Sequence, residues 1–352
     1  MADVAQHAQV SVSTVSHVLN RTRKVNVETE EAVANAVRKL GYVHNTLARS
    51  LARSRTNSIG VALTAITNIY FSEIVQAIEA ECAANDHTLL LVDTHDEPRT
   101  ELRAVQALHR RRVDGIILAP SFDPELRALA YLTDHSVPVV LVDRMTTTAF
   151  DQVGVENKRS TAQLVAHLIG HGHRRIGMIS GLAGLATTVE RVSGYKAALR
   201  KANIPFDANL IRSGESLSAP AQMVTQELLR IADPPTALIT ANNLMTVGAL
   251  RALRDAHVNV PDDIALAGFD DFEWADLLAP RLTTVAQPSR ELGVTAARLL
   301  FARLGAPDRT PTTIRLRPTV RIRSSCGCGT HSSVAVAQES LVHDQLLLSD
   351  SR

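Results

Sequence analysis

Two short motifs in this sequence carry side chains that could hold a metal ion. His171-Gly-His173 offers two imidazoles and Cys326-Gly-Cys328 offers two thiolates, and both groups are common zinc ligands. The histidine motif has no third ligand beside it, and the cysteine motif lies near the chain terminus with only Cys82 left over. We therefore predict that no metal binds and that the cysteines form an inert pair. A metal site or a redox pair is the alternative for the cysteines.

Catalytic chemistry has little support in the sequence. No motif combines a nucleophile, a base and an orienting acid. Gly181-x-x-Gly184 is too weak a signal for a phosphate-binding loop, and we expect it to let the backbone approach a ligand. The sequence therefore predicts a protein that is not an enzyme and that needs no cofactor.

The chain from Ile59 onward alternates short apolar runs with amphipathic segments. The runs are 59–63, 88–92, 115–119, 138–142, 176–180, 236–240 and 264–268. Strands that alternate with helices predict an α/β body whose parallel sheets are covered on both faces. Because the strands are too many for one sheet, we expect two doubly wound lobes. Such lobes bind ligands in the crevice beyond the carboxyl ends of their strands.

Length and charge indicate a small basic module joined to a larger body. The chain has 352 residues, which favours two or three domains. Residues 1–58 carry eight Lys and Arg against four Asp and Glu, whereas the remainder carries 29 against 32. This charge pattern is typical of a DNA-binding module attached to another domain. No run reaches the ~18 apolar residues of a membrane span and no signal peptide is recognised, so we expect a cytoplasmic protein without a membrane partner.

The N-terminal residues predict a helix-turn-helix. A short helix over Asp3–Ala8 is followed by a turn around Gln9-Val10, and Ser11 is a suitable N-cap for a second helix over Val12–Leu19. This arrangement places the second helix in the major groove of DNA.

A third helix is expected to begin after Asn26, and Gly41 is its expected C-terminal stop. The segment 45–53 is at best one short helix, and 54–58 is polar and linker-like. Because a nine-residue helix is marginal in water, we expect it to fold only when it docks.

These segments resemble the headpiece of the lactose-repressor (LacI/GalR) family. The matching segments are Asp3-Val-Ala, Val10 to Asn20, Gly41-Tyr42 and Leu47-Ala-Arg-Ser-Leu51, and Thr14 to Arg23 is most similar to the purine-repressor branch. The body continues the resemblance through Arg112-Val-Asp-Gly115, Asp143-Arg144, Gly170-His-Gly-His-Arg174, Arg191-x-x-Gly194-Tyr195, Val260-Pro-Asp-Asp263, Gly268-Phe-Asp-Asp271 and Leu282-Thr-Thr284. The family more often has Gly or Asn in place of Gln9, and Asn-Asp in place of Asn242-Asn243.

The resemblance implies that the headpiece binds operator DNA. Base reading would fall to Val12, Ser13 and His17, because a valine can touch a thymine methyl, a hydroxyl can donate or accept, and an imidazole can donate to guanine. Leu51 matches the hinge leucine that wedges into the minor groove and kinks the duplex. The residues expected to contact the DNA backbone are Thr14, Asn20, Thr22, Arg23 and Arg49.

The resemblance also implies that the body is a periplasmic-binding-protein-like effector domain. The matching effector contacts are Asp143, Arg191, Asn242 and Asp270. Carboxylate, guanidinium and amide groups can each form hydrogen bonds to two adjacent hydroxyls, which favours a sugar over a purine as the effector. Arg191 also suits a carboxylated effector. Further contacts are expected from Asn68, Tyr70 and Phe71. Trp274 forms either another wall of the site or ordinary packing.

The predicted organisation is a headpiece at 1–44, a hinge helix and linker at 45–58, an effector and dimerisation domain at 59–325 and a disordered tail at 326–352. One lobe is expected at about 59–157 with 287–317, and the other at about 158–286 with 318–325. Val334, Leu341 and Leu348 repeat every seven residues, but a tetramerising coiled coil needs more repeats than this.

The predicted function is a transcription regulator, most simply a repressor, that binds palindromic operator DNA with a central CG step as a homodimer. An effector bound between the lobes changes operator affinity, as either inducer or corepressor. Three alternatives are a solute-binding protein of a sugar transport system, a sugar-modifying enzyme, and an architectural DNA-binding protein that responds to no small molecule.

Overall fold

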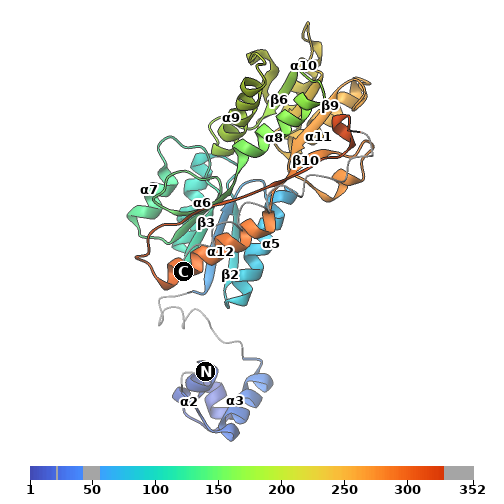
Figure 1. Ribbon diagram of the computed structural model, residues 1–352. Coiled ribbons are helices and arrows are strands. Elements are labelled where there is room, and N and C mark those ends of the chain that lie inside the picture. The colour runs from blue at the N-terminus through green and yellow to red at the C-terminus, as the bar shows by residue number, and fades with distance from the viewer. Residues whose placement is uncertain (21–22, 43–55, 329–352) are drawn as a thin grey trace, which may run out of the picture. The chain divides into compact units, whose positions relative to one another are not determined.

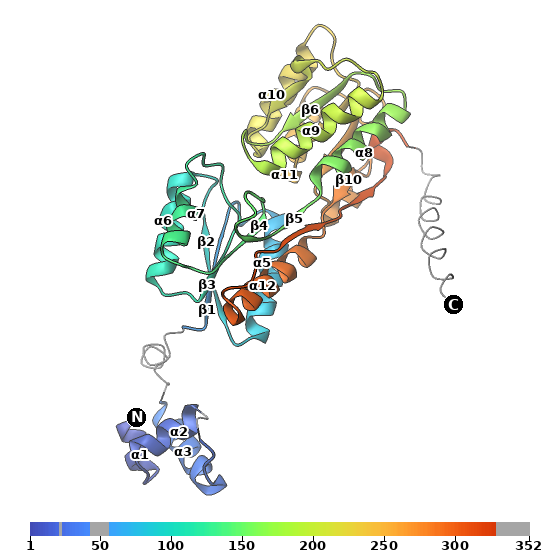
Figure 2. The same ribbon diagram turned by 60° about the vertical axis from the view of Figure 1, so that its left-hand side comes forward.

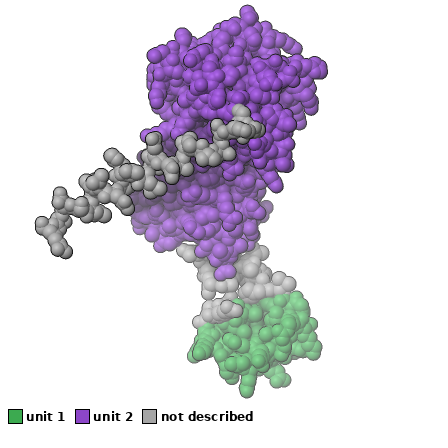
Figure 3. All heavy atoms as spheres, turned by 45° about the vertical axis from the view of Figure 1, so that its right-hand side comes forward, with its two compact units in different colours: residues 1–57 green, residues 58–352 purple. Residues whose placement is uncertain are grey.

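The computed structural model of the chain describes residues 1–20, 23–42 and 56–328. It divides into two compact units, Met1–Asn57 and Ser58–Arg352 (Figure 3). The predicted fold class is confirmed, because the first unit is helical and the second alternates strands and helices. None of the described helices is long and apolar enough to cross a membrane.

The first unit packs three helices around a small apolar core. The helices are α1 (Ala2–His7), α2 (Val12–Asn20) and α3 (Val27–Leu40), and the buried core residues are Val4, Ala5, Val15, Val33 and Ala36. These helices are too short to be stable alone, so this shared apolar contact must hold the unit together.

Local signals define where the helices of the first unit begin and end. The Ser11 hydroxyl accepts the Thr14 amide at 3.1 Å, and the Asn26 side chain accepts the Thr29 amide at 3.0 Å. Gly41 ends α3 with a φ of +56°. Gln9 takes a φ of +53° in the turn between α1 and α2, a conformation that costs a residue with a Cβ about 1–2 kcal/mol.

The second unit contains two lobes, each built on a six-stranded sheet. Lobe 1 comprises β1 (Ser58–Leu63), α5 (Ile69–Ala84), β2 (Thr88–Asp93), α6 (Pro98–Arg110), β3 (Gly115–Leu118), α7 (Arg127–Asp134), β4 (Val139–Asp143), β5 (Asp151–Val155), α12 (Ser289–Gly305) and β11 (Thr313–Leu316). Its strand order is β11-β5-β4-β3-β1-β2, and every pair is parallel. Helices α5 and α12 cover one face and α6 and α7 the other (Figure 1).

Lobe 2 repeats this arrangement. It comprises α8 (Asn157–Gly170), β6 (Ile176–Ser180), α9 (Ala186–Lys201), η1 (Ala208–Leu210), β7 (Ile211–Ser213), α10 (Ser218–Arg230), β8 (Ala237–Thr240), α11 (Asn243–Asp255), β9 (Ala265–Phe269), η2 (Glu273–Asp276), β10 (Thr283–Ala286), β12 (Thr319–Arg321) and η3 (Ser324–Cys326). The strand order is β12-β10-β9-β8-β6-β7, with β12 antiparallel to β10. Helices α8 and α9 pack on one face, and α10 and α11 on the other (Figure 2).

The chain passes between the lobes at three places within 56–328, after β5, β10 and β11. Because of these crossings, each lobe is assembled from separate parts of the sequence.

The predicted boundary of the C-terminal tail, residue 326, falls inside a packed segment. The structure describes the chain as far as Cys328, and Cys326 is fully buried. Residues 329–352 and most of the hinge expected at 45–58 lie outside the described residues.

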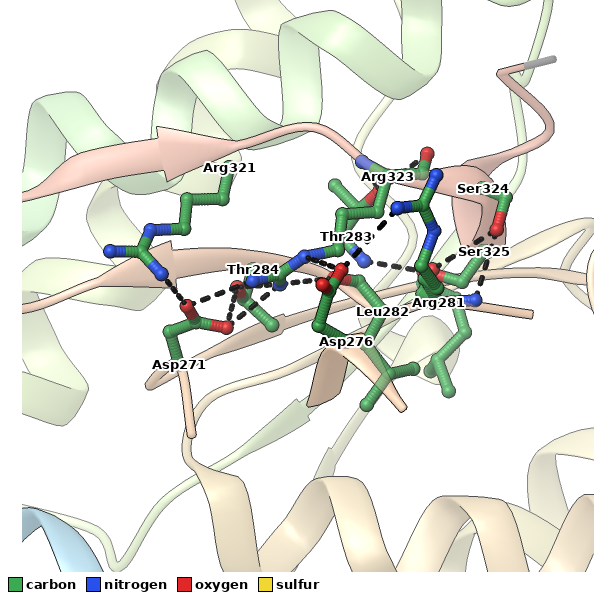
Figure 4. A network of polar contacts seen from close by, with 11 residues as sticks. Asp271, Asp276, Arg281, Leu282, Thr283, Thr284, Arg321, Arg323, Ser324 and Ser325 are labelled. Atoms are coloured by element: carbon green, nitrogen blue, oxygen red, sulfur yellow. Dashed lines mark hydrogen bonds and ion pairs between the residues drawn. The ribbon is translucent and has the colours of Figure 1, made fainter. Parts of the chain in front are cut away.

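An ionic network fastens the last described segment to lobe 2 (Figure 4). Both carboxylate oxygens of Asp271 accept from the guanidinium of Arg323, at 2.8 and 3.0 Å, and Arg321 donates to the same carboxylate at 2.7 Å. The Thr284 hydroxyl also donates to Asp271, at 2.7 Å. Burial opposes ionisation of Asp271, but the hydrogen bonds from Arg323 and Thr284 outweigh it and lower the pKa of this carboxyl.

Replacing Asp271 with Asn should destabilise lobe 2 in a pH-dependent way. Loss of the bidentate partner leaves the largely buried Arg323 guanidinium with the more exposed Asp276, 3.1 Å away, as its remaining carboxylate among the described residues, at a cost of about 1–3 kcal/mol at neutral pH. Because folding lowers the pKa of Asp271, its contribution is complete above the unfolded pKa of ~3.9 and disappears as the pH falls through the folded pKa.

The measurement is urea unfolding of both proteins from pH 7 down to the lowest pH at which the wild type stays folded. The exposed Asp308→Asn is the matched control and should leave the unfolding midpoint unchanged. A D271N cost at pH 7 no larger than that of the control would contradict this account of the network.

Candidate functional site

The recognition helix expected from the sequence, α2, turns one face to the core and another to solvent. Val15 is fully buried, whereas Val12 is 48% exposed and Ser13 is also exposed. The hydroxyls of Ser11 and Ser13 lie 2.7 Å apart, which orients Ser13 at the start of the helix. His17 is half-buried on the same helix.

The other expected DNA contacts are only partly described. Thr14 is half-buried beside the Ser11 hydroxyl, and Arg23 is exposed. Asn20 is the last residue of α2. Thr22, Arg49 and Leu51 lie outside the described residues.

A cavity of about 560 Å³ lies between the two lobes. Its walls come from the segments that follow β1, β2 and β4 in lobe 1 and β6, β7, β8 and β9 in lobe 2. These are carboxyl ends of parallel strands, the position predicted for ligand binding in doubly wound folds. The cavity volume is within the range of small-molecule sites. Seven of the eight effector residues predicted from the sequence line it: Asn68, Tyr70, Phe71, Asp143, Arg191, Asn242 and Asp270.

Two aspartates occupy corresponding positions in the lobes. Asp143 ends β4 with a φ of +66°, and Asp270 follows β9 with a φ of +69°. Both side chains are almost fully buried. Aspartate adopts this left-handed conformation more readily than most residues, and strain of this kind is concentrated at functional sites. Each lobe therefore presents one carboxylate to the cavity from the end of a central strand.

A tyrosine and a glutamine join the two carboxylates. The Tyr70 hydroxyl donates to Asp143 at 2.7 Å and lies 3.4 Å from the Gln287 side-chain oxygen, while the Gln287 amide donates to Asp270. Burial, and then the adjacent Asp143 carboxylate, hold the pKa of Tyr70 well above its ordinary value, so the hydroxyl stays protonated as a donor. Burial also raises the pKa of Asp270, although Arg191 opposes that shift.

Arg191 is held rigidly at the cavity wall. Its Nε donates to Asn157 at 2.8 Å, another of its nitrogens donates to the carbonyl of Ala241, and its guanidinium carbon lies 3.9 Å from the centre of the Phe269 ring. These contacts satisfy part of the guanidinium and leave the rest facing the cavity, where Arg191 is a lining residue. A guanidinium fixed in this way binds hydroxyls or a carboxylate without a large loss of side-chain entropy.

Arg144 also lines the cavity, but its charge is compensated within lobe 1. Both terminal nitrogens donate to the Asp96 carboxylate, and its Nε lies 3.7 Å from Asp143. The described lining residues then carry more carboxylates than guanidiniums: Asp96, Asp143, Glu97, Glu215 and Asp270 against Arg144 and Arg191.

A reciprocal amide pair connects the lobes beside the cavity. The Asn68 side chain donates to Asn243 at 3.0 Å, and the Asn243 side chain donates back to Asn68 at 2.7 Å. Asn68 caps α5 in lobe 1, and Asn243 begins α11 in lobe 2. Both residues are buried, so each amide satisfies the other's donor and acceptor out of contact with water.

The structure does not bring Trp274 to the cavity. The indole lies in η2, is 39% exposed, and packs on Phe272 with ring centroids 3.9 Å apart. Of the two interpretations that its sequence position allowed, ordinary packing matches this geometry. Trp274 follows Asp270 by four residues, but the chain turns away from the cavity between them.

Sequence reasoning missed several lining residues. Gln287 follows β10 where the chain crosses back to lobe 1, and a residue in a crossing segment has no periodic signal. Thr187 and Thr188 open α9, and Ser216 lies in the loop after β7. Recognising β7 would have indicated Ser216, but β7 has only three residues and no apolar run.

The chain is similar over most of its length to known bacterial regulators. Residues 1–45 match the family of bacterial regulatory proteins of the lacI type, and 165–326 match the periplasmic binding protein-like domain. The HTH-type transcriptional repressor PurR of Vibrio atlanticus (strain LGP32) is 34% identical, over 92% of this chain and 97% of that protein. The ribose operon repressor of Haemophilus influenzae (strain ATCC 51907 / DSM 11121 / KW20 / Rd) is also 34% identical, over 92% and 98%.

Solved structures agree with this relationship. The lac repressor dimer bound to operator and the anti-inducer ONPF has a TM-score of 0.83 at 28% identity, over 92% of this chain and 98% of that chain. The transcriptional regulator CelR in complex with cellobiose has a TM-score of 0.71 at 29% identity, over the same shares of both chains. The chain therefore belongs to the lacI family of bacterial regulatory proteins, whose members are transcription regulators and not enzymes.

Proposed function

We propose that this protein is a repressor that binds a palindromic operator as a homodimer. Its affinity for the operator falls or rises when a small polyhydroxylated molecule binds in the interlobe cavity. The observation that supports this most directly is the presence, in one chain, of a helix that exposes Val12 and Ser13 and of a cavity between two lobes that is lined by buried charged side chains. Such a protein acts where the DNA is, in the cytoplasm and on the nucleoid.

Operator reading rests on the exposed face of α2. Val12 and Ser13 lie on the first turn, which is the end of a recognition helix that meets the base edges. His17, one helical turn further on, adds a donor for guanine. The lac repressor, with the same fold, binds its operator as a dimer, and two-fold symmetry in this protein would require a palindromic site. Leu51 remains our proposed wedge for a central CG step.

The charges of the cavity favour a neutral polyol. A purine base is flat and presents few hydroxyls, and an anionic effector would meet a surplus of carboxylates among the described lining residues. Asp143, Asp270 and Asn242 all line the cavity and offer hydrogen-bond acceptors and a donor for hydroxyl groups. Phe71 offers an apolar face for a sugar ring. Similar proteins include a ribose operon repressor, a regulator in complex with cellobiose and the repressor PurR, so the choice of a polyol rests on the cavity.

Coupling between the cavity and the operator would pass through the relative position of the lobes. The Asn68–Asn243 pair and the contact of 3.4 Å between the Tyr70 hydroxyl and the Gln287 side chain join the two lobes, so they depend on the lobe arrangement seen here. An effector that inserts hydroxyls among these groups changes the free-energy difference between lobe arrangements by its differential affinity, typically ~1–3 kcal/mol.

Replacing His17 with Ala should weaken discrimination of the operator. The loss of one base-edge donor costs about 1–3 kcal/mol, or roughly 5- to 150-fold in affinity for the operator relative to a scrambled duplex. Fluorescence anisotropy at fixed physiological salt measures this ratio. The control is His135→Ala, an exposed histidine of the second unit, which should bind both duplexes as the wild type does. Wild-type discrimination by H17A would refute the assignment of His17 to base reading.

Replacing Asp143 with Ala should abolish stabilisation by the effector. A ligand at about 100 times its Kd stabilises the folded state by ~2.7 kcal/mol, which appears as a rise in melting temperature. We expect one or more members of a panel of pentoses, hexoses and disaccharides to raise the wild-type value, and purines to leave it unchanged. The exposed Asp262→Ala should respond as the wild type does. Stabilisation by a purine alone would overturn the polyol assignment.

Replacing Asn243 with Asp should loosen the contact between the lobes. A carboxylate at residue 243 cannot donate to Asn68. It would also lie close to the Asp270 carboxylate, which accepts the backbone N–H of Asn243 at 3.1 Å, so we expect the free energy of unfolding to fall by about 1–3 kcal/mol. Urea unfolding and small-angle X-ray scattering measure stability and lobe separation. The same substitution at the exposed Asn209 is the control. Unchanged stability and dimensions in N243D would show that the amide pair does not hold the lobes.

A further inference from the structure

The two motifs that the sequence offered as isolated metal ligands meet in lobe 2. The Cys328 sulfur lies 3.2 Å from Nε2 of His167 and 3.0 Å from Nε2 of His171, and these three ligand atoms all lie within 4.8 Å of one another. The Cys326 sulfur lies 3.1 Å from that of Cys328 and 3.2 Å from Nε2 of His167. His167, His171 and Cys328 therefore form one compact group, and Cys326 adjoins it through His167 and Cys328, although more than 150 residues separate the histidines from the cysteines.

Local structure points these side chains toward one another. His167 and His171 are four residues apart at the C-terminal end of α8, so they share one face of the helix, with ring centroids 4.7 Å apart. Gly327 takes a φ of +86°, which turns the chain so that Cys326 and Cys328 present their sulfurs on the same side. A Cβ at residue 327 would meet nothing within 4 Å, so this glycine is required by backbone conformation and not by space.

The donor set and its spacing match tetrahedral zinc. Ligands held at ~2.3 Å for sulfur and ~2.05 Å for nitrogen in a tetrahedron lie roughly 3.3–3.8 Å apart. The four sulfur–nitrogen and sulfur–sulfur contacts given above are 3.0–3.2 Å, so these pairs would need to separate by about half an ångström. The Cys326 sulfur lies outside the group of atoms within 4.8 Å of one another, so it would need to move closer to Nε2 of His171. Two thiolates balance the charge of a divalent ion, which removes the main cost of placing it beside a buried residue such as Cys326. Soft sulfur with imidazole selects against Mg²⁺ and Ca²⁺.

The surroundings supply support and access. The Thr283 hydroxyl lies 3.1 Å from the Cys326 sulfur, where it can donate to a thiolate and orient it. Cys326 is fully buried, whereas His171 is exposed and leaves a route for the ion from solvent. The segment that carries the cysteines is already tied to lobe 2 on its other side by the Asp271 network.

We propose that His167, His171, Cys326 and Cys328 bind one structural Zn²⁺ that fastens the C-terminal segment to helix α8. The site lies in lobe 2 and shares no residue with the interlobe cavity. It is closed by four protein ligands, so its role is to hold structure and not to activate water. This proposal is independent of the operator and of the effector.

The test is the metal content of the full chain, purified without a polyhistidine tag or chelator and in the presence of a thiol reductant. Inductively coupled plasma mass spectrometry should find about one zinc ion per chain. His171→Ala should reduce the zinc content at least about tenfold, and Cys328→Ser should do the same. His173→Ala is the matched control from the same loop, because His173 contacts Thr236 outside the cluster and should keep the zinc.

A second measurement uses only the wild-type protein, so its result does not depend on whether the variants fold. Wild-type protein stripped with a chelator should melt at a lower temperature and recover when zinc is added, and substitution with Co²⁺ should produce the thiolate charge-transfer band and strong visible bands of a tetrahedral site. Absence of zinc from the wild type together with no such bands on Co²⁺ addition would overturn the proposal. A Cys326–Cys328 disulfide in the protein isolated from cells would overturn it equally, in favour of a redox pair.

Discussion

The geometry of parallel strands is the constraint on which the two lobes of the second unit depend. Strands that run in one direction place all their carboxyl ends at one edge of the sheet, and helices must then cover both faces because the central strands are buried on both. Two such sheets, joined by crossings after β5, β10 and β11, turn these edges toward one cavity. The side chains that face a ligand are therefore those just beyond strand ends, and neither lobe alone provides a complete site.

Burial determines the chemistry of that cavity. Asp143, Asp270 and Arg191 are each almost fully buried, and such groups are costly unless they are partnered. Tyr70, Gln287 and Asn157 supply partners, but carboxylates and guanidinium retain capacity that faces the open volume. A ligand that supplies matching polar groups can complete these hydrogen bonds. Because a buried group without a partner carries a free-energy cost, the cavity would discriminate against a ligand that leaves these groups without partners.

The C-terminal segment shows a different way of stabilising a fold. β12 is the only strand that runs antiparallel to its neighbour in the described sheets, and it lies at the sheet edge, where few backbone hydrogen bonds hold it. The Asp271 network holds this segment at Arg321 and Arg323, and the contacts with His167 and His171 hold it at Cys326 and Cys328. In the proposed zinc-bound form, stability of the segment would rest on specific ionic and metal bonds more than on apolar packing.

The sequence by itself determined the elements that depend on local physics. The helix ends at Ser11 and Gly41, and the apolar runs of β1, β3 and β4, were predictable because neighbouring residues supply their partners or their periodicity. Seven of the eight residues that we expected to contact an effector line the cavity, including the four taken from the family resemblance, whereas Trp274 does not.

Only the tertiary structure decided which distant residues meet. The short strands β5, β7 and β12 have little apolar signal and exist because neighbouring strands pair with them. Gln287 reaches the cavity, and Asn68 meets Asn243, through chain crossings that no window of sequence contains. The histidine and cysteine motifs looked isolated because a search for a third ligand nearby in sequence cannot find one that the fold brings from the other end of the domain. Local sequence encodes hydrogen bonds between near neighbours, whereas the contacts that build these sites are set by how whole lobes pack.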